Sequence, residues 1–267
     1  KRINLRYMTM TERIRLVVLV FALLASARAF SGGMDSGGGR GLVCFQTKEV
    51  ADKVRDNLGY INDSQLTEIT FIEPIDLYYA KQRRGIDHRA PKLATPYQSE
   101  SFLQYLERLV QRIEVSIPPL GEKIRSTQKE FSGDNTIWHD LGLIPIFDEK
   151  SVAHYNTKLC TVTTMAIQFK EEGRNFLNID HRLFFHPKHS VMGKAVLFMH
   201  EYFYLLARKL GGADSRSTRI VLGHLLKNET GVKVEDLAKI LLDFRFLGEQ
   251  DIVGGGNTMY EYYPTFD

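Results

Sequence analysis

The sequence of 267 residues is 43% hydrophobic and 25% charged, which is ordinary for a soluble globular protein with one sizeable core or two small ones. Its net charge is +3, but residues 1–29 hold six basic side chains against Glu12, a net of +5. The remainder therefore carries +3 − 5 = −2. Such a balance offers no basic face to a polyanion and argues against nucleic-acid binding.

The N-terminus predicts export. Arg13 and Arg15 form a positively charged start, an apolar run follows over residues 16–25, and Ala27-Arg28-Ala29 is a small-x-small cleavage pattern. The apolar run is shorter than the ~20 residues that span a bilayer, so a membrane anchor is the weaker interpretation. We expect residues 1–29 to be a signal peptide and the mature chain to be periplasmic or extracellular, with no transmembrane segment after cleavage.

The first half of the mature chain alternates strand and helix patterns. Residues 30–41 predict a flexible Gly-rich lead-in. Apolar or alternating runs predict strands, and apolar residues spaced one turn apart predict helices. Pro74 suits a helix start, and Ser99 is the expected cap of the long helix. In chain order we expect a strand at 42–46, a helix at 47–58, a strand at 68–73, a helix at 75–83, a loop at 84–97 and helices at about 99–117 and 120–131.

The second half begins with strands and ends with helices. After a turn at Gly133, strands are expected at 143–147, 161–169 and 176–179. A central helix over 189–210 is followed by a helix over 215–227 and another over 234–246. The glycines at 254–256 then lead into a tyrosine-rich tail, whose aromatic residues either pack locally or dock on the protein or on a partner. One globular domain is therefore expected over 42–253, and a hinge with its tail over 254–267.

The two cysteines, Cys44 and Cys160, are expected to form a disulfide. An even number of cysteines in an exported chain favours pairing, and the pair would join the first strand to the strand beginning at Thr161. The alternative is two buried thiols that act as small hydrophobic side chains.

The order of several short stretches carries a resemblance. The stretches are LVCF, ITFIEPIDLYYAKQRRG, KLCTVTTMAIQF, FLNID, LFMHEYFY and DSRSTR. Together they resemble a group of uncharacterised secreted proteins of Gram-negative bacteria. In that group a Gly-rich start leads into a Cys-bearing strand, followed by an L-L-D-x-Y-like stretch, a Cys-to-Gln strand, an H-E-x-x-Y helix and a Ser-to-Arg helix. The resemblance implies the architecture and the positions of interest, and it departs from the pattern at Leu205, where a basic residue is expected.

The most informative stretch is residues 195–207, AVLFMHEYFYLLA, which is apolar or aromatic apart from His200 and Glu201. A helix that is hydrophobic on all sides is normally buried, so these two polar side chains require partners. The string H-E-x-x-Y resembles the zinc-peptidase signature H-E-x-x-H, in which two histidines bind the metal and the glutamate is the general base. Here Tyr204 stands where the second histidine would be.

Two interpretations of this pair follow. In the structural one, His200 is bonded within the core and Glu201 is bound by Arg216 or Arg219 of the next helix, near the expected cap Ser215. In the catalytic one, Glu201 is the general base beside a Zn²⁺ ion held by His200. The metal's further ligands would be His224, which lies as far from Gly212 as His200 does, or histidines of the stretch HRLFFHPKH at 181–189.

We therefore expect an α+β protein in which a small sheet packs with at least four helices. Its central buried helix, 189–210, would form a helical hairpin with 215–227. The favoured function is a non-catalytic or binding role in the cell envelope, with an envelope protein or peptidoglycan as partner and no cofactor. The alternative is a divergent zincin-like metallohydrolase that acts on peptide or cell-wall material.

Overall fold

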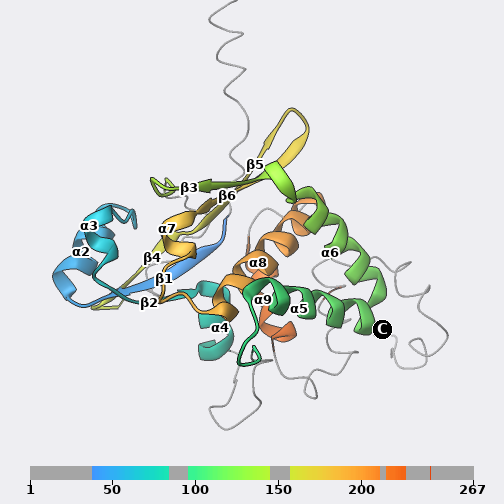
Figure 1. The fold of residues 1–267 in the computed structure, drawn as a ribbon, viewed down its shortest axis with the longest axis horizontal. Coiled ribbons are helices and arrows are strands. Elements are labelled where there is room, and N and C mark those ends of the chain that lie inside the picture. The colour runs from blue at the N-terminus through green and yellow to red at the C-terminus, as the bar shows by residue number, and fades with distance from the viewer. Residues whose placement is uncertain (1–37, 84–95, 145–156, 211–214, 227–240, 242–267) are drawn as a thin grey trace, which may run out of the picture.

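The computed structural model describes residues 38–83, 96–144, 157–210, 215–226 and 241. Within these residues the chain forms eight α-helices and two three-stranded sheets (Figure 1), which confirms the α+β class. The predicted signal peptide and the tail at 254–267 lie outside the described residues.

The first sheet is antiparallel, in the order β2-β1-β4. It consists of β1 (Arg40–Phe45), β2 (Ile69–Pro74) and β4 (Cys160–Thr164). The prediction of a flexible lead-in is wrong for residues 38–41, which are buried, and β1 begins within them. Glycine is needed there because a Cβ on Gly38 would lie 2.0 Å from the carbonyl oxygen of Ala166. The glycines therefore allow close backbone packing at this point.

A disulfide joins β1 to β4 at one end of the first sheet, as expected. Cys44 and Cys160 face each other in the β1–β4 register and are bonded. The link closes a loop with a sequence separation of 116 residues. In the chain-entropy account, a loop of this length stabilises the fold by about 3–5 kcal/mol.

The second sheet has the order β3-β6-β5, with β3 parallel and β5 antiparallel to β6. The strands are β3 (Thr136–His139), β5 (Ala166–Glu171) and β6 (Arg174–Asp180). The single strand expected at 161–169 is divided at Met165, because the N–H groups of Met165 and Ala166 both donate to the Gly39 carbonyl. The chain thereby passes from one sheet to the other. The prediction of a strand at 143–147 is wrong for residues 143 and 144, which belong to no strand. Residues 145–147 lie outside the described chain.

The helices follow most of the sequence predictions. In chain order they are α2 (Lys48–Asp56), α3 (Asp63–Leu66), α4 (Ile75–Arg83), α5 (Phe102–Ser116), α6 (Pro118–Glu130), α7 (His181–Phe184), α8 (Val191–Lys209) and α9 (Arg216–Leu225). The cap of α5 is Ser101 and not Ser99, because Ser101 and Gln104 form a reciprocal capping box. The helix expected over 234–246 lies outside the described residues except for buried Leu241.

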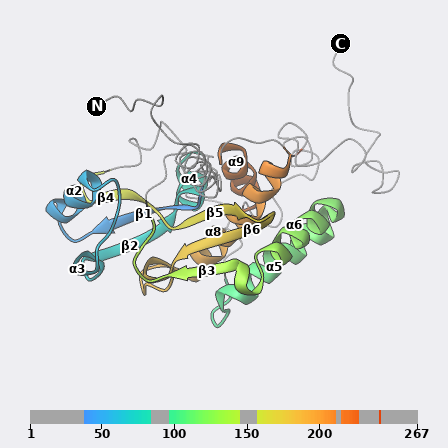
Figure 2. The same cartoon turned by 90° about the horizontal axis from the view of Figure 1, so that it is seen from above.

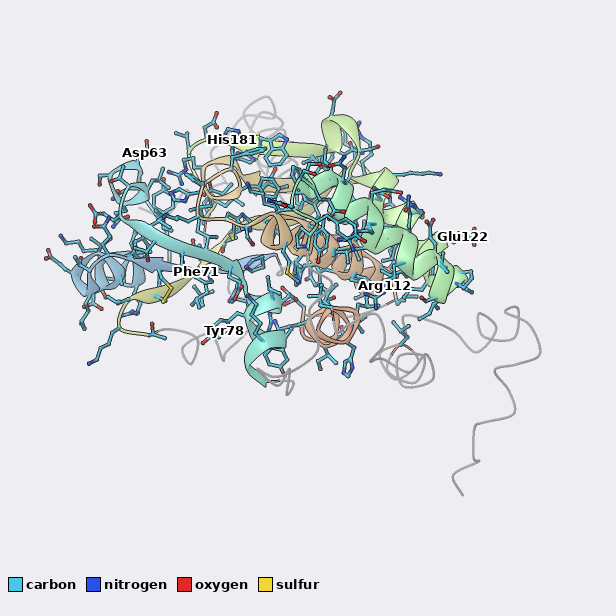
Figure 3. The ribbon with its side chains drawn as sticks, turned by 60° about the horizontal axis from the view of Figure 1, so that its bottom comes forward. Asp63, Phe71, Tyr78, Arg112, Glu122 and His181 are labelled. Carbon is cyan, nitrogen blue, oxygen red and sulfur yellow. A yellow bond between two sulfur atoms is a disulfide. The ribbon has the colours of Figure 1, made fainter. Side chains whose placement is uncertain are left out.

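Helix α8 is the centre of the molecule. Fifteen of its residues are buried, and α4, α5, α6, α9 and β5 all pack on it. Figures 1 and 2 show α2 and α3 at one end of the strands, and α5 and α6 at the other. The same separation is visible in Figure 3, between Asp63 at one end and Arg112 and Glu122 at the other. The expected neighbour α9 does contact α8, although residues 211–214 between them are not described.

Among the described helices, none has both the length and the apolar character needed to cross a membrane.

Candidate functional site

His200 is bonded to a carboxylate from a different helix. Its Nδ1 donates to Oδ1 of Asp76 over 2.9 Å, and both residues are only 1% exposed. Asp76 lies in the first turn of α4, directly after β2. The bond therefore joins α8 to the junction between the first sheet and α4.

Local sequence explains how α8 comes this close to α4. Ser190 caps α8 by accepting a hydrogen bond from the N–H of Gly193. A Cβ on Gly193 would lie 2.8 Å from the ring of His189 and 3.1 Å from Pro74. Glycine at this position therefore lets the start of α8 pack against the β2–α4 corner.

The electrostatics of the pair favour its charged form. Burial alone would lower the pKa of His200, but the carboxylates of Asp76 and Glu201 outweigh it and the pKa is raised. Burial alone would raise the pKa of Asp76, but His200 and Arg219 outweigh it and the pKa is lowered. The imidazolium, the carboxylate and the guanidinium of Arg219 on α9 thus form one buried group of charges.

Glu201 has its own donors on both carboxylate oxygens. The backbone N–H of Gly39 donates to Oε1 over 2.6 Å, and the side-chain amide of Gln168 donates to Oε2 over 2.7 Å. The same amide also donates to the Glu201 carbonyl over 2.6 Å. Glu201, 0% exposed, therefore links α8 to the start of β1 and to the centre of β5.

Burial raises the pKa of Glu201, and the opposing effects of His200, Gln168 and Gly39 do not cancel it. The two amide donors and the charge of His200 therefore leave the ionised carboxylate incompletely compensated. The site therefore contains one carboxylate that prefers its charge, Asp76, and one that resists it, Glu201.

Three of the remaining predicted residues, Tyr204, Ser215 and Arg219, lie beside this cluster. Tyr204 stacks on His200 one turn along α8, with ring centroids 5.9 Å apart. Ser215 is the N-cap residue of α9, but its hydroxyl makes no capping bond and instead accepts from Arg219 over 3.3 Å. Arg219 therefore interacts electrostatically with Asp76 and His200. The hydrogen bonds to the Glu201 carboxylate come instead from the backbone N–H of Gly39 and the side-chain amide of Gln168. The side chain of Arg216 is not among those described.

The upstream histidines are not gathered around His200. A ring nitrogen of His186 is hydrogen-bonded to the Leu66 carbonyl at 3.2 Å. A ring nitrogen of His189 is hydrogen-bonded to the Phe184 carbonyl at 3.1 Å. His181 pairs with Asp140 at 2.9 Å. His224 lies in the last turn of α9 and is partly exposed. Over the part of the chain that the structure describes, no three His, Cys, Asp or Glu side chains form a metal-binding group.

One atom of the cluster has an unmet bonding capacity. Nε2 of His200 is buried and has no hydrogen-bond partner among the described residues. Because Nδ1 is bound to Asp76, Nε2 is the nitrogen that a ligand or a metal would use.

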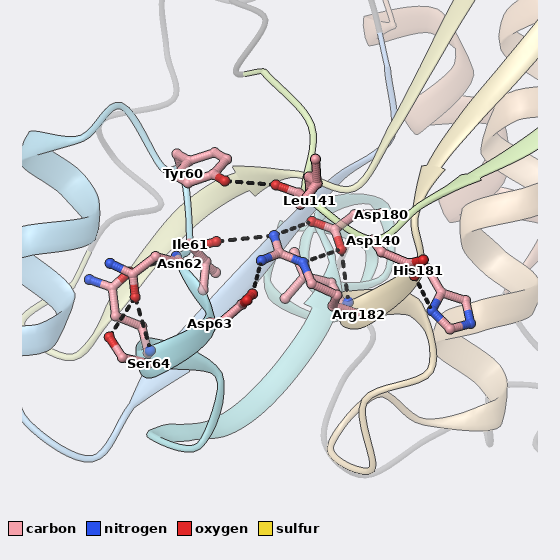
Figure 4. A network of polar contacts seen from close by, with 12 residues as sticks. Tyr60, Ile61, Asn62, Asp63, Ser64, Asp140, Leu141, Asp180, His181 and Arg182 are labelled. Atoms are coloured by element: carbon pink, nitrogen blue, oxygen red, sulfur yellow. Dashed lines mark hydrogen bonds and ion pairs between the residues drawn. The ribbon is translucent and has the colours of Figure 1, made fainter.

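A second polar network lies between α3 and α7 (Figure 4). The guanidinium of Arg182 donates to Asp63 at 2.7 Å, to the Ile61 carbonyl at 3.0 Å and to Asp180 at 3.1 Å. Asp180 also caps α7. The network joins α3, β6 and α7, but it opens to solvent through Asp63, whose side chain is 81% exposed.

Three residues of the buried cluster were not predicted from the sequence as site residues: Asp76, Gln168 and Gly39. A signal was present for two of them, since IDLYY and AIQF are stretches of the stated resemblance and each places one polar residue among apolar ones. Gly39 carried no such signal, because its role lies in its backbone N–H.

Comparisons with known proteins identify no relative. No protein-family model matches the sequence, no curated protein is similar to it, and no solved structure matches the fold. The site must therefore be interpreted from its own geometry.

Proposed function

We propose that this protein is an exported, non-catalytic envelope or binding protein in which Asp76, His200 and Glu201 form a structural cluster. The observation that carries the proposal is the state of the Glu201 carboxylate. Both of its oxygens are occupied by donors from the protein itself, and the residue is fully buried. A general base must present an oxygen to a water or a substrate, whereas this carboxylate joins β1, β5 and α8.

Export is supported by the disulfide and by two features of the sequence. The Cys44–Cys160 disulfide is compatible with an oxidising compartment. The predicted signal peptide and the resemblance to secreted proteins of Gram-negative bacteria support a place in the periplasm or outside the cell. An envelope protein or peptidoglycan is the partner class that this location favours.

The second candidate is a zincin-like metallohydrolase, and one specific observation favours it. His200 holds a carboxylate on Nδ1 and leaves Nε2 without a partner, which is the arrangement that orients many metal-bound histidines. In this alternative, Asp76 would orient His200, and His224 and a further residue would complete the ligand set for Zn²⁺.

Metal analysis of the purified, untagged protein separates the two candidates. The structural proposal expects less than stoichiometric metal, and expects Glu201→Gln to lower the melting temperature strongly. The metallohydrolase expects about one equivalent of zinc that is lost in His200→Ala and kept in Glu201→Gln. His181→Ala is the matched control, because loss of this exposed histidine should change neither the metal content nor the melting temperature. Stoichiometric zinc that depends on His200 would overturn the structural proposal.

A further inference from the structure

A cluster of aromatic rings reaches the surface at the edge of the second sheet. Trp138 on the edge strand β3 and Phe185 after α7 are 39% and 47% exposed. Their ring centroids are 5.2 Å apart, and both pack on the buried ring of Phe184 at 5.1 and 5.0 Å. We refer to Trp138, Phe185 and the adjoining Lys188 and Lys194 as the aromatic surface. Exposed rings on a rigid base are typical of a binding surface.

The aromatic surface carries positive charge. The ammonium group of Lys194 lies 5.9 Å from the Phe185 ring centroid. Lys188 and Lys194 both act on the nearby His186, whose pKa is lowered by burial and then by these two cations. Neither lysine has an ion-pair partner within the described ranges. Asp140, which follows Trp138 by two residues, is paired with His181. An acidic ligand with aromatic groups would fit this surface.

The same chain contains a segment of that chemistry. Residues 259–267, MYEYYPTFD, hold four aromatic side chains and two acids, Glu261 and Asp267, with no basic residue. Pro264 favours an extended backbone in the residue before it, which limits the entropy lost on docking. The three glycines at 254–256 separate the segment from the preceding chain.

The segment is long enough to reach the aromatic surface. Eighteen residues lie between Leu241, which is buried in the core, and Tyr260. Extended, they span about 60 Å, which exceeds the diameter of about 40 Å expected for a domain of about 200 residues. Tethering also raises the effective concentration of the segment into the millimolar range.

We propose that the segment 259–267 docks on the aromatic surface of its own chain. Its rings would pack on Trp138 and Phe185, while Glu261 and Asp267 would pair with Lys188 and Lys194. Each such contact is modest alone, since surface ion pairs contribute about 0–1 kcal/mol, so the covalent tether is an essential part of the interaction. The proposal does not depend on the role of His200.

Fluorescence tests the proposal directly, because Trp138 is the single tryptophan of the chain. The unaltered chain is compared with the double variant Glu261→Lys, Asp267→Lys by acrylamide quenching. We expect the quenching constant to rise about twofold in the variant, with a red-shifted emission maximum, since the ring becomes uncovered. The matched control is Glu122→Lys, Glu171→Lys, which reverses two exposed charges on α6 and β5 and should leave Trp138 unchanged.

Charge reversal on the aromatic surface tests whether a matched pair of changes restores the quenching constant. Lys188→Glu, Lys194→Glu alone should also raise the quenching constant, and combining it with the tail variant should restore the wild-type value. Circular dichroism of each variant distinguishes loss of docking from loss of folding. A tail variant with unchanged emission and quenching would overturn the proposal. So would quenching that changes over a hundredfold range of protein concentration, because a second copy would then be the occupant.

A variant that leaves the charges intact distinguishes the rings from the acids. Tyr262→Ser, Tyr263→Ser, Phe266→Ser in the full chain should match the charge-reversed tail in quenching. If the lysine variants expose Trp138 while neither tail variant does, the surface binds something other than this segment and the proposal is wrong.

Discussion

The buried cluster of Asp76, His200 and Glu201 and the Arg182 network use similar groups in different surroundings. Each joins segments that are distant in the sequence through carboxylates and cationic side chains. The members of the buried cluster are 0–1% exposed, whereas Asp63 of the Arg182 network is 81% exposed. Water can replace a lost partner at Asp63 but not at Glu201. Burial, rather than the number of contacts, should therefore determine the energetic weight of each network.

The largest effect is expected for Asp76→Asn. This change leaves the buried cations His200 and Arg219 without their carboxylate, and breaking a buried ion pair costs about 3–5 kcal/mol. The raised pKa of His200 means that the pair's contribution is fully present below the unfolded imidazole pKa and lost as the pH rises through the folded one. The lowered pKa of Asp76 removes its contribution only in stronger acid. Urea unfolding should therefore show a larger loss at pH 6 than at pH 9.

A similar loss at both pH values would show that His200 is neutral throughout and would remove the ionic part of the comparison.

Glu201→Gln should have the next largest effect, about 2–3 kcal/mol, the upper part of the range for a buried donor that loses its acceptor. The substitution places an amide NH₂ group where both neighbours, Gly39 and Gln168, are donors, so one buried donor loses its acceptor. Thermal unfolding measures the loss, and the exposed Glu49→Gln on α2 is the control that should leave the melting temperature unchanged. Equal behaviour of the two variants would contradict the structural role of Glu201.

Gly39→Ala should follow, at about 1–3 kcal/mol, because overpacking forces the surroundings to shift. A Cβ at Gly39 would lie 2.3 Å from the Leu197 side chain and 2.6 Å from Oε1 of Glu201. Gly173→Ala is a useful control, since its Cβ would meet no atom within 4 Å and only its φ of +80° is unfavourable. Denaturant unfolding should place Gly39→Ala as the more destabilised of the two.

The smallest effect is expected for Asp63→Asn, the same chemical change as Asp76→Asn at an exposed site. Its ion pair with Arg182 lies in solvent, and such pairs contribute about 0–1 kcal/mol. Arg182 would also keep the Ile61 carbonyl and Asp180. A loss by urea unfolding that equals that of Asp76→Asn would remove the distinction between the two networks.

Local patterns were sufficient to predict most elements of the fold. The spacing of Val50 and Val54 and the proline before α4 act within a few residues, so they are visible in the sequence. The pairing of Cys44 with Cys160 could be expected because the chain has only two cysteines. The pattern also located the centre of the protein, since an all-apolar helix such as α8 must be buried.

Only the tertiary structure determined the partners of the two polar residues in that helix. The sequence required that His200 and Glu201 be compensated, but Asp76, Gln168 and Gly39 reach them from 124, 33 and 162 residues away. The division of the strand at Met165 has the same origin, because its N–H donates to a carbonyl on β1's lead-in. Periodicity records which face of an element is buried. It does not record which distant backbone or side chain meets that face, since this depends on how the sheets and helices pack together.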